Sequence, residues 1–275
     1  MLIYPYIDKS MKKINLKDGT KIYCLKETEA VVLDEHINGY LEFDINIKSG
    51  DTIIDVGANI GVLGIRLSQD FKNINIYSFE PIPEIYQVLE KNAELSLNPN
   101  FKTYMKGISN QQKNLNFTYY PNSPALSTAQ PEIWTKDKEN LISAVKGNLA
   151  NMPAQLWWAK LIPKFITPLI VKYLTLGSKK IQSPVTTLSQ FIEEKKIDCI
   201  HLIKIDCEGE EINVLRGIKN EHWKLINSII MEVNDISNNI EVAKEILSKN
   251  GFKNIKMEKE KGFEKTKLIN ICAKK

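Results

Sequence analysis

Residues 51–61, with the sequence DTIIDVGANIG, constrain the fold more than any other part of the chain. Residues 52–56 are β-branched and mostly apolar, which predicts a short buried strand. Gly57 and Gly61 then interrupt the strand and open a helix that we predict over residues 62–69. This strand–turn–helix unit is typical of an open α/β sheet, in which ligands bind at the carboxyl ends of the strands. The free N–H groups at the start of the helix face the same place.

Glu80 supplies the second half of this predicted site. It ends a predicted strand over residues 74–80 and lies about twenty residues beyond the glycine turn, where a ribose-binding acid is expected. The spacing fits NAD or S-adenosylmethionine. However, Asn59 and Val62 replace two glycines of the dinucleotide fingerprint, and Asp55 precedes the turn.

The carboxylate of Asp55 favours S-adenosylmethionine over NAD. A negative charge there repels a pyrophosphate, whereas it suits the ammonium and sulfonium groups of S-adenosylmethionine, directly or through water. The alternative is an unliganded α/β turn in which Asp55 caps the helix.

Composition places the chain among ordinary globular proteins. Its 275 residues suffice for one large α/β domain or two small ones, and 43% of them are hydrophobic. The net charge of +4 is far from a nucleic-acid-binding signature, so we expect no nucleic acid partner. The four cysteines lack metal spacing, and residues 1–10 lack a secretory signal. No stretch approaches about eighteen uncharged apolar residues, and we therefore expect a cytoplasmic protein.

Residues 1–50 precede the predicted sheet and form a cap or lid segment, followed by a main domain over residues 51–275. Asp18-Gly19 predicts a hairpin turn. Residues 28–44 predict a helix or lid over the cofactor pocket. His36 and Tyr40 share one face of that helix, and packing roles are expected for both.

Residues 129–182 interrupt the α/β alternation. Within them, residues 155–176 are rich in large apolar side chains and carry three lysines as their only charges: Lys160, Lys164 and Lys172. We predict a helical insertion that lids the active site. Two alternatives are a helical pair packed on the domain and an amphipathic element that makes peripheral contact with a membrane surface.

The remaining segments continue the α/β pattern. Before the insertion we predict a helix that begins at Pro81 and Pro83, strands over residues 101–105 and 115–120, and a loop over residues 120–128 that faces the substrate. After the insertion we predict helices over residues 185–195 and 238–250, strands over 199–206 and 228–234, and a closing hairpin over 252–257 and 268–273.

Three blocks of the sequence resemble the FkbM-type S-adenosylmethionine-dependent methyltransferases. They are IDVGANIG at residues 54–61, SFEPIPEIYQVLEKN at 78–92 and HLIKIDCEGEEINVLRG at 201–217, the last followed by IIMEVN at 229–234. The resemblance covers roughly residues 35–273. The long insertion and Glu210, which stands where the family has a small residue, depart from the pattern. These departures bear on the substrate rather than on the cofactor.

The resemblance implies a Rossmann-like class I methyltransferase with a seven-stranded, mostly parallel sheet and one antiparallel strand. It implies methyl transfer, usually to a hydroxyl oxygen. The positions expected to hold S-adenosylmethionine are Asp55, Gly57, Asn59, Gly61 and Glu80, and further candidates at the neighbouring strand ends are Pro81, Ile108, Ser109 and Asp206.

An aliphatic hydroxyl is a poor nucleophile until it loses its proton, so the protein must supply a base or a metal. Asp206 and Glu232 follow or end two predicted strands and would both reach the pocket. Lys204 and Glu208 are further catalytic candidates, although Glu208 fits equally well as an acid that complements a helix dipole. Asp206, Glu232 and Asn234 offer the oxygen ligands that Mg²⁺ prefers.

We therefore predict an O-methyltransferase that acts on a hydroxyl of a natural-product intermediate, a polyketide or peptide, free or bound to a carrier protein. The family's substrates and the loop YYPNSPALST at residues 119–128 point to this acceptor. The alternatives are a sugar hydroxyl of a glycan or glycolipid, a nitrogen or carbon acceptor, a cofactor-binding module without chemistry, and a NAD-dependent dehydrogenase. The sequence assigns no oligomeric state.

Overall fold

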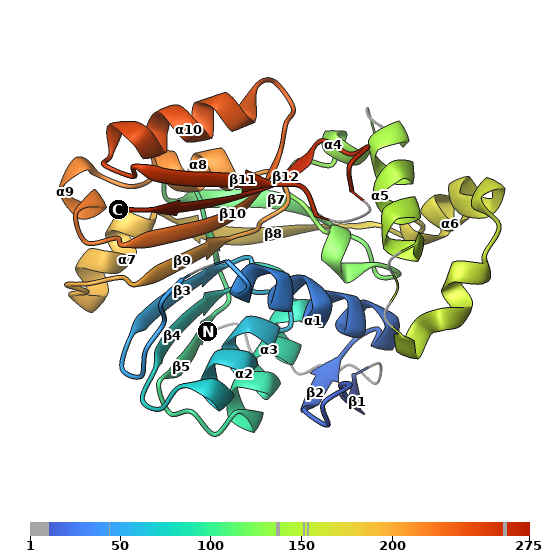
Figure 1. The fold of residues 1–275 in the computed structure, drawn as a ribbon, viewed down its shortest axis with the longest axis horizontal. Helices are drawn as coiled ribbons and strands as arrows, with labels where there is room; N and C mark the ends of the chain where they lie inside the picture. Colours follow the sequence, from blue (N-terminus) through green and yellow to red (C-terminus); the bar gives the residue numbers. More distant parts are fainter. Residues whose placement is uncertain (1–10, 44, 136–137, 151, 153, 261–262) are drawn as a thin grey trace.

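A seven-stranded sheet forms the centre of the computed structural model, which describes residues 11–275 apart from 44, 136–137, 151, 153 and 261–262 (Figure 1). Its strands follow the order β11-β12-β10-β9-β3-β4-β5. Neighbouring strands are parallel except at β12, which is antiparallel to β10 and β11. The predicted sheet is therefore confirmed. The strand bounds are β3 Thr52–Val56, β4 Asn75–Phe79, β5 Phe101–Tyr104, β9 Leu202–Ile205, β10 Ser228–Asn234, β11 Asn254–Glu258 and β12 Leu268–Lys274.

Helices cover both faces of this sheet (Figure 1). One face carries α1 (Glu27–Leu41), α2 (Val62–Asp70) and α3 (Pro83–Leu95), and the other carries α7 (Leu188–Lys195), α8 (Glu211–Arg216), α9 (Asn220–Trp223) and α10 (Asn239–Lys249). Because successive side chains of a strand point to opposite faces, Ile53 joins the first hydrophobic cluster and Ile54 joins the second. Burial on both faces explains why the central strands are apolar almost throughout.

The helix ends follow the expected capping chemistry. α3 begins at Pro83, whose missing N–H costs nothing in the first turn. α7 begins after Thr187, which forms a capping box with Gln190. α10 is followed by Gly251 at a φ of 90°, a left-handed conformation that suits glycine. The predicted helices and the closing hairpin are confirmed in these regions, with shifts of a few residues at their ends.

A second sheet, with the order β6-β8-β7, packs beside the carboxyl end of the central one. Its strands are β6 Gly107–Ile108, β7 Lys113–Tyr119 and β8 Lys179–Thr186. The antiparallel strand predicted near 115–120 is confirmed as β7. β8 was not predicted, since Pro184 lies in it and proline argues against a middle strand. Consequently the helical segment ends before residue 179, and the helix predicted from residue 185 begins only at 188.

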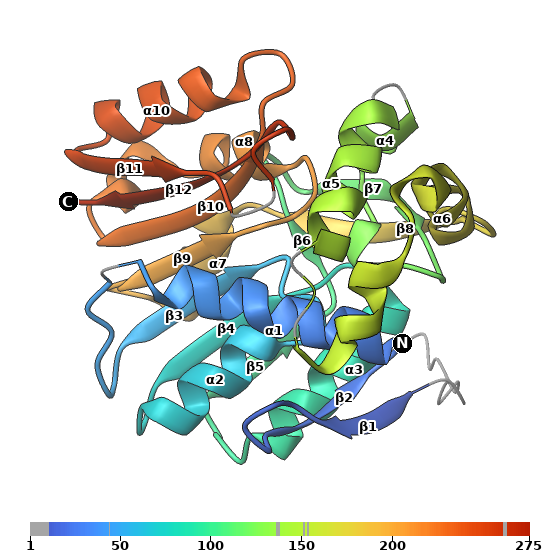
Figure 2. The same ribbon diagram turned by 45° about the vertical axis from the view of Figure 1, so that its right-hand side comes forward.

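The segment that connects β7 to β8 within the second sheet is helical and broken. It contains α4 Glu132–Thr135, α5 Lys138–Ala150, the 3₁₀ helices η2 Ala154–Leu161 and η3 Lys164–Ile166, and α6 Thr167–Leu174. In both ribbon views α5 and α6 lie beyond the edge of the central sheet, and α4 lies above α5, away from α1 (Figure 2). Every helix in the described part of the chain is too short or too polar to cross a membrane. Residues 1–10, where we expect no secretory signal, lie outside the described residues.

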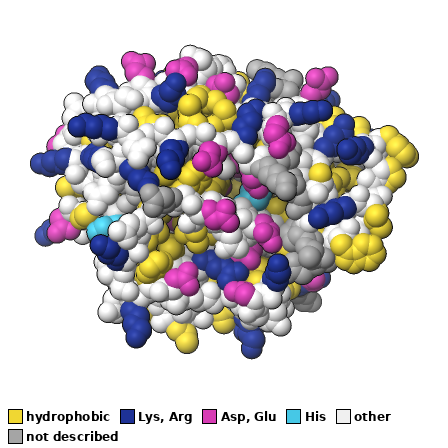
Figure 3. Space-filling view, viewed as in Figure 1, with side chains coloured by type: hydrophobic (Ala, Val, Ile, Leu, Met, Phe, Trp, Pro, Cys, Tyr) yellow, Lys and Arg dark blue, Asp and Glu magenta, His cyan; other side chains and the backbone are white. Residues whose placement is uncertain are grey.

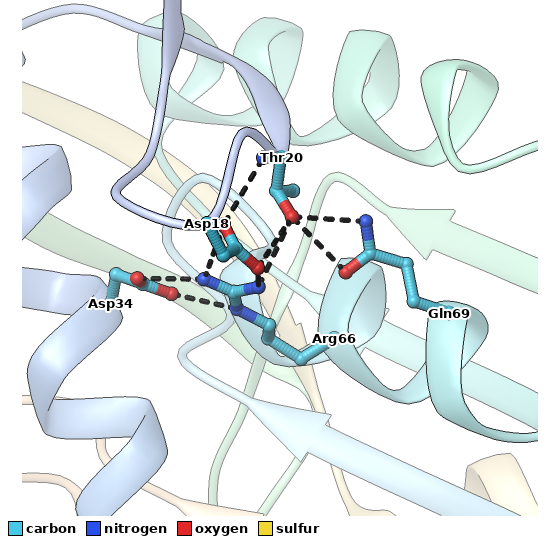
Figure 4. A network of polar contacts seen from close by, with 5 residues as sticks. All are labelled: Asp18, Thr20, Asp34, Arg66 and Gln69. Carbon is cyan, nitrogen blue, oxygen red and sulfur yellow. Dashed lines mark hydrogen bonds and ion pairs between the residues drawn. The ribbon is translucent and has the colours of Figure 1, made fainter.

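A polar network joins α1 to α2 and to the predicted N-terminal hairpin, which is confirmed as β1 (Lys12–Asn15) and β2 (Lys21–Cys24) (Figure 4). Arg66 of α2 donates two hydrogen bonds of 2.8 Å to the carboxylate of Asp34 in α1. Arg66 also pairs with Asp18 in the hairpin turn, and this hydrogen bond lowers the pKa of Asp18 to about 2. Thr20 and Gln69 complete the network. The network therefore fixes α1 over the sheet.

We predict that Arg66→Ala lowers the free energy of unfolding by about 3 kcal/mol, because it leaves the buried carboxylate of Asp34 without its partner. Urea denaturation followed by circular dichroism measures this loss. The matched control is Lys91→Ala, which removes an exposed ion pair with Glu94 and should change stability by no more than about 0.5 kcal/mol. Equal losses in the two variants would contradict the assigned role of Arg66.

Candidate active site

A cavity of about 430 Å³ opens where β3, β4, β9 and β10 end. Four strand ends meet there because parallel strands present their carboxyl ends at one edge of the sheet. Nine of the residues selected from the sequence line this cavity: Gly57, Asn59, Glu80, Pro81, Ile108, Lys204, Asp206, Glu208 and Glu232. Four do not: Asp55, Gly61, Ser109 and Asn234.

The turn after β3 requires glycine because β3 pairs with β9, which brings the backbone of Asp206 close to residue 57. Gly57 has a φ of 73°, and a Cβ atom at this position would lie 1.9 Å from the backbone oxygen of Asp206. Only glycine fits such an approach. Gly61 has a different role, since its Cβ would lie 2.6 Å from the side chain of Leu89. Gly57 thus shapes the cavity wall, whereas Gly61 allows α2 to pack against α3.

Glu80 is held at the end of β4 by backbone donors. The N–H of Ile82 donates to Oε1 at 2.9 Å, and the N–H of Asn59 donates to Oε2 at 3.2 Å. Only 5% of Glu80 is exposed, and this burial raises the pKa of its carboxyl group to about 7 although both hydrogen bonds oppose the rise. Each oxygen retains a lone pair for a further donor.

Lys204 connects the glycine turn to the carboxylates of Asp55 and Asp206. Its Nζ donates to the carbonyl oxygen of Gly57 at 2.7 Å and lies 3.4 Å from Asp55 Oδ1 and 3.5 Å from Asp206 Oδ2. Burial alone would lower the pKa of Lys204, but attraction to Asp55 and Asp206 raises it above the ordinary lysine value. Lys204 is therefore a cation at neutral pH.

Asp55 does not line the cavity, although we expected it to interact with a cationic cofactor directly or through water. It is 1% exposed, and burial raises its pKa. Within the described residues, neither of its carboxylate oxygens has a hydrogen-bond partner, and its nearest cation is Lys204. The charge of Asp55 thus acts on Lys204.

Ser109 lies behind the cavity wall and contacts Glu210, which itself lines the cavity. Ser109 is fully buried, and its hydroxyl donates to Glu210 Oε2 at 2.9 Å. Gln130 Nε2 donates to Glu210 Oε1 at 3.0 Å, and Asn213 Nδ2 donates to Oε2 at 3.1 Å. The acid that departs from the family pattern therefore joins the β6 loop to the start of the helical segment, and Ser109 contributes to this contact rather than to the cavity wall.

The acids at the ends of β9 and β10 share the cavity. Burial raises the pKa of both Glu208 and Glu232 well above the ordinary glutamate value, and the charge of Asp206 adds to the rise. Glu211, the neighbouring acid, instead accepts backbone N–H groups from Cys207 and Gly209. This supports the helix-terminus role for Glu211, while Glu208 reaches the cavity.

The structure gathers no metal site at this position. Among the described residues, one group of three His, Cys, Asp or Glu ligand atoms lies within 4.8 Å, formed by Glu193, Glu221 and His222, none of which lines the cavity. Asn234, expected as a ligand with Asp206 and Glu232, does not line the cavity either.

Tyr40 is a site residue for which we expected only packing. It is buried in α1, and its hydroxyl donates to Asp206 Oδ2 at 3.3 Å. His36, one turn earlier, also lines the cavity, and its Nε2 lies 3.4 Å from Oε1 of Glu260. The charge of Asp206 acts on Glu260 and raises its pKa. The four-residue spacing of His36 and Tyr40, which places them on one face of α1, was the sequence signal that could have identified them as site residues. His201, by contrast, accepts a hydrogen bond from Thr52 N at the opposite edge of the sheet.

Glu29 joins α1 to the loop predicted over residues 120–128, and residues 122–127 of this loop line the cavity. Its Oε1 accepts hydrogen bonds of 3.0 Å from the hydroxyl of Ser123 and from the N–H of Ala125. Burial raises the pKa of Glu29 to about 7 although these hydrogen bonds lower it. Sequence patterns did not identify this contact, since its partners lie more than ninety residues apart.

The family model described as "Methyltransferase FkbM domain" matches residues 55–254. "Methyltransferase 1" of Beauveria bassiana is 28% identical over 246 residues, which cover 88% of this chain and 89% of the relative. "31-O-demethyl-FK506 methyltransferase FkbM" of Streptomyces tacrolimicus is 23% identical over 96% of this chain and 97% of the relative. "AMB antimetabolite synthetase AmbE" of Pseudomonas aeruginosa is 25% identical over 83% of this chain but only 10% of that protein.

We predict that Gly57→Ala abolishes ligand binding in the cavity and lowers the midpoint of thermal unfolding, because the new Cβ would overlap the backbone of Asp206. Gly39→Ala is the matched control. Gly39 lies in α1 with nothing within 4 Å of its Cβ position, so alanine should raise helix stability by up to about 1 kcal/mol. Differential scanning calorimetry compares the two, and equal midpoints would contradict the tight approach of β3 to β9.

Proposed function

The chain belongs to the FkbM methyltransferase family and is thus an S-adenosylmethionine-dependent methyltransferase, and we propose that it methylates a hydroxyl group of a natural-product intermediate. One observation carries this proposal: a single cavity joins a ribose-binding type of acid, Glu80, to a group of proton-accepting carboxylates at Asp206, Glu208 and Glu232. The first part suits the cofactor, and the second suits removal of a proton from an acceptor.

The cavity residues fit S-adenosylmethionine by their chemistry. The free lone pairs of Glu80 can accept the two hydroxyls of a ribose, while Ile108 and Pro81 offer apolar surface beside it. Gly57 and Asn59 bring the backbone to the cavity wall, and Asp206 offers a negative charge. These residues would hold the cofactor, whereas Asp55 would act through Lys204.

We predict that the dissociation constant of S-adenosylhomocysteine rises as the pH falls below about 7, since the Glu80 carboxyl, with its pKa raised to about 7, must then lose a proton to bind. The rise is up to about tenfold per pH unit. Calorimetry should show no such slope in Glu80→Gln. Glu211→Gln should retain it, because the pKa of Glu211 is also raised to about 7 but its side chain lies outside the cavity.

The opposite pattern, a slope lost in Glu211→Gln and kept in Glu80→Gln, would refute the ribose assignment. NADH serves as the comparison ligand. Tighter binding of NADH than of the methionine compounds would favour the dehydrogenase alternative.

When bound, S-adenosylmethionine supplies an electrophilic methyl group. The protein must then position an acceptor hydroxyl and remove its proton. Glu232 and Glu208 suit this step because their raised pKa values make them stronger bases than ordinary glutamates. We assign proton acceptance to Glu232. Lys204 and Tyr40 hold Asp206 in place and are positioning residues.

Glu232→Gln should lower kcat by about 10²–10⁴-fold while leaving the dissociation constant of the cofactor unchanged. Glu258→Gln makes the same charge change at an exposed position of β11 and should keep full activity. Retained turnover in Glu232→Gln would transfer the base assignment to Glu208 or Asp206, which Glu208→Gln and Asp206→Asn test in the same assay. Cofactor binding without turnover towards every acceptor in wild type would favour a non-catalytic module.

The cavity wall formed by the helical segment and the loop before it indicates the class of acceptor. That wall is apolar, with Leu126, Trp134, Val145 and Leu149 among its residues, and accommodates a carbon skeleton better than a bare sugar. The names of the two bacterial relatives, one a 31-O-demethyl-FK506 methyltransferase and one an antimetabolite synthetase, favour a polyketide or peptide, free or carrier-bound. The glycolipid alternative shares the apolar part. A screen of hydroxylated acceptors separates these classes, and its repetition with Mg²⁺ or with EDTA tests the magnesium dependence expected from the sequence.

A further inference from the structure

A surface of exposed apolar side chains lies outside the proposed cofactor and catalytic residues. Ten large hydrophobic residues are exposed in the described part of the chain, and six of them lie within residues 157–173. These six, which we call the apolar patch, are Trp157, Trp158, Leu161, Phe165, Leu169 and Tyr173. Phe165 is 82% exposed and Leu169 is 67% exposed, so neither contributes to a folded core. Such a concentration marks an interaction surface.

The helical segment does not need the patch residues for its own packing. The inner face of α6 already packs Ile170, Val171 and Leu174 against the cluster that contains Trp134 and Leu141. Its outer face presents Leu169 and Tyr173, four residues apart, to solvent, and Leu176 is exposed just beyond the end of the helix. A helix that is apolar on both sides requires a second partner beyond the protein.

Positive charge surrounds these apolar side chains. The 53 residues from 140 to 192 contain six lysines and no aspartate or glutamate. Because the whole chain has a net charge of only +4, the remainder of the chain is net negative. Figure 3 shows hydrophobic side chains at the right-hand end of the molecule, over the helices η2, η3 and α6, with Lys or Arg side chains next to them. Lys160, Lys164 and Lys172 lie between the patch residues and are exposed.

We propose that residues 157–176 are a docking surface for an anionic lipid membrane. Tryptophan and tyrosine favour the boundary between headgroups and acyl chains, where Leu161, Phe165 and Leu169 can be buried. The lysines then contact the anionic headgroups. A second copy of this chain fits less well, because a two-fold interface would bring the same lysines together. Lysine is also depleted in the cores of protein interfaces.

The docking surface lies next to the acceptor side of the cavity. Tyr173 belongs to the patch and also lines the cavity, and its backbone oxygen accepts a hydrogen bond of 3.0 Å from Asn122 in the loop over residues 119–128. A membrane at this surface therefore places the cavity mouth where an amphiphilic acceptor partitions. This consequence rests on the proposed function, whereas the docking surface itself does not.

Co-sedimentation with vesicles tests the proposal without cofactor or acceptor. Wild type should bind vesicles of phosphatidylcholine mixed with phosphatidylglycerol more tightly than vesicles of phosphatidylcholine alone. The combined variant Leu161→Ser, Phe165→Ser, Leu169→Ser should reduce partitioning about tenfold or more. The combined variant Lys160→Gln, Lys164→Gln, Lys172→Gln should reduce it to a similar degree at low salt only.

The chain offers matched controls for both variants. Leu97→Ser, Met105→Ser, Met257→Ser removes three exposed apolar side chains elsewhere, and Lys102→Gln, Lys253→Gln, Lys256→Gln removes three exposed lysines elsewhere. Both controls should bind vesicles like wild type. Binding of S-adenosylhomocysteine, measured by calorimetry, shows that each variant is folded.

Two outcomes would overturn the proposal: wild type that binds neither vesicle type, or controls that lose as much binding as the patch variants. Self-association of wild type that is lost in the serine variant, without vesicle binding, would assign the patch to a second copy instead. Because the assay needs no turnover, a failure of the proposed acceptor class leaves this result unaffected.

Discussion

The site depends on one buried cation. Lys204 is 4% exposed, yet it bonds to the carbonyl of the glycine turn and pairs with acids of two adjacent strands. A lone buried ammonium is costly, and so is a lone buried carboxylate, but each offsets the cost of the other. Asp55 therefore needs no contact with a ligand to be required at its position. It keeps Lys204 charged, and Lys204 in turn fixes the turn and Asp206.

The fold was largely predictable from the sequence because its strands are buried on both faces and its helices carry clear ends. Ile53 and Ile54 show the first point, and the Thr187 capping box shows the second. The strand β8 was missed for a physical reason. Pro184 and alternating polar residues hide a strand whose partner, β7, lies sixty or more residues earlier. Long-range pairing leaves no local trace in such a segment.

The site was predictable only at its strand ends. Glu80, Asp206 and Glu232 could be placed because a residue at the carboxyl end of a parallel strand has little choice of position. Tyr40 and Glu29 could not, because they reach the cavity from a helix outside the sheet, and their partners depend on how that helix packs. Asp55 and Ser109 lie next to the cavity in the sequence, but neither lines it, because their side chains contact Lys204 and Glu210. Local sequence thus identified these positions but not their partners.

Polar contacts hold α1 over the cavity in addition to the apolar packing that it shares with the sheet. The apolar clusters, one of which includes Ala30 and Ile37 of α1, depend little on pH for their stability. Two side-chain contacts of α1 at the cavity, Glu29 with Ser123 and Tyr40 with Asp206, are polar, and burial raises the pKa of Glu29 to about 7. A glutamate with a raised pKa stabilises the folded state below its unfolded pKa, and this contribution is lost as the pH rises through about 7. The Arg66–Asp34 pair keeps α1 in place at neutral pH, because Arg66 remains charged there. Loosening at the cavity end of α1 can therefore occur without release of the helix from the domain.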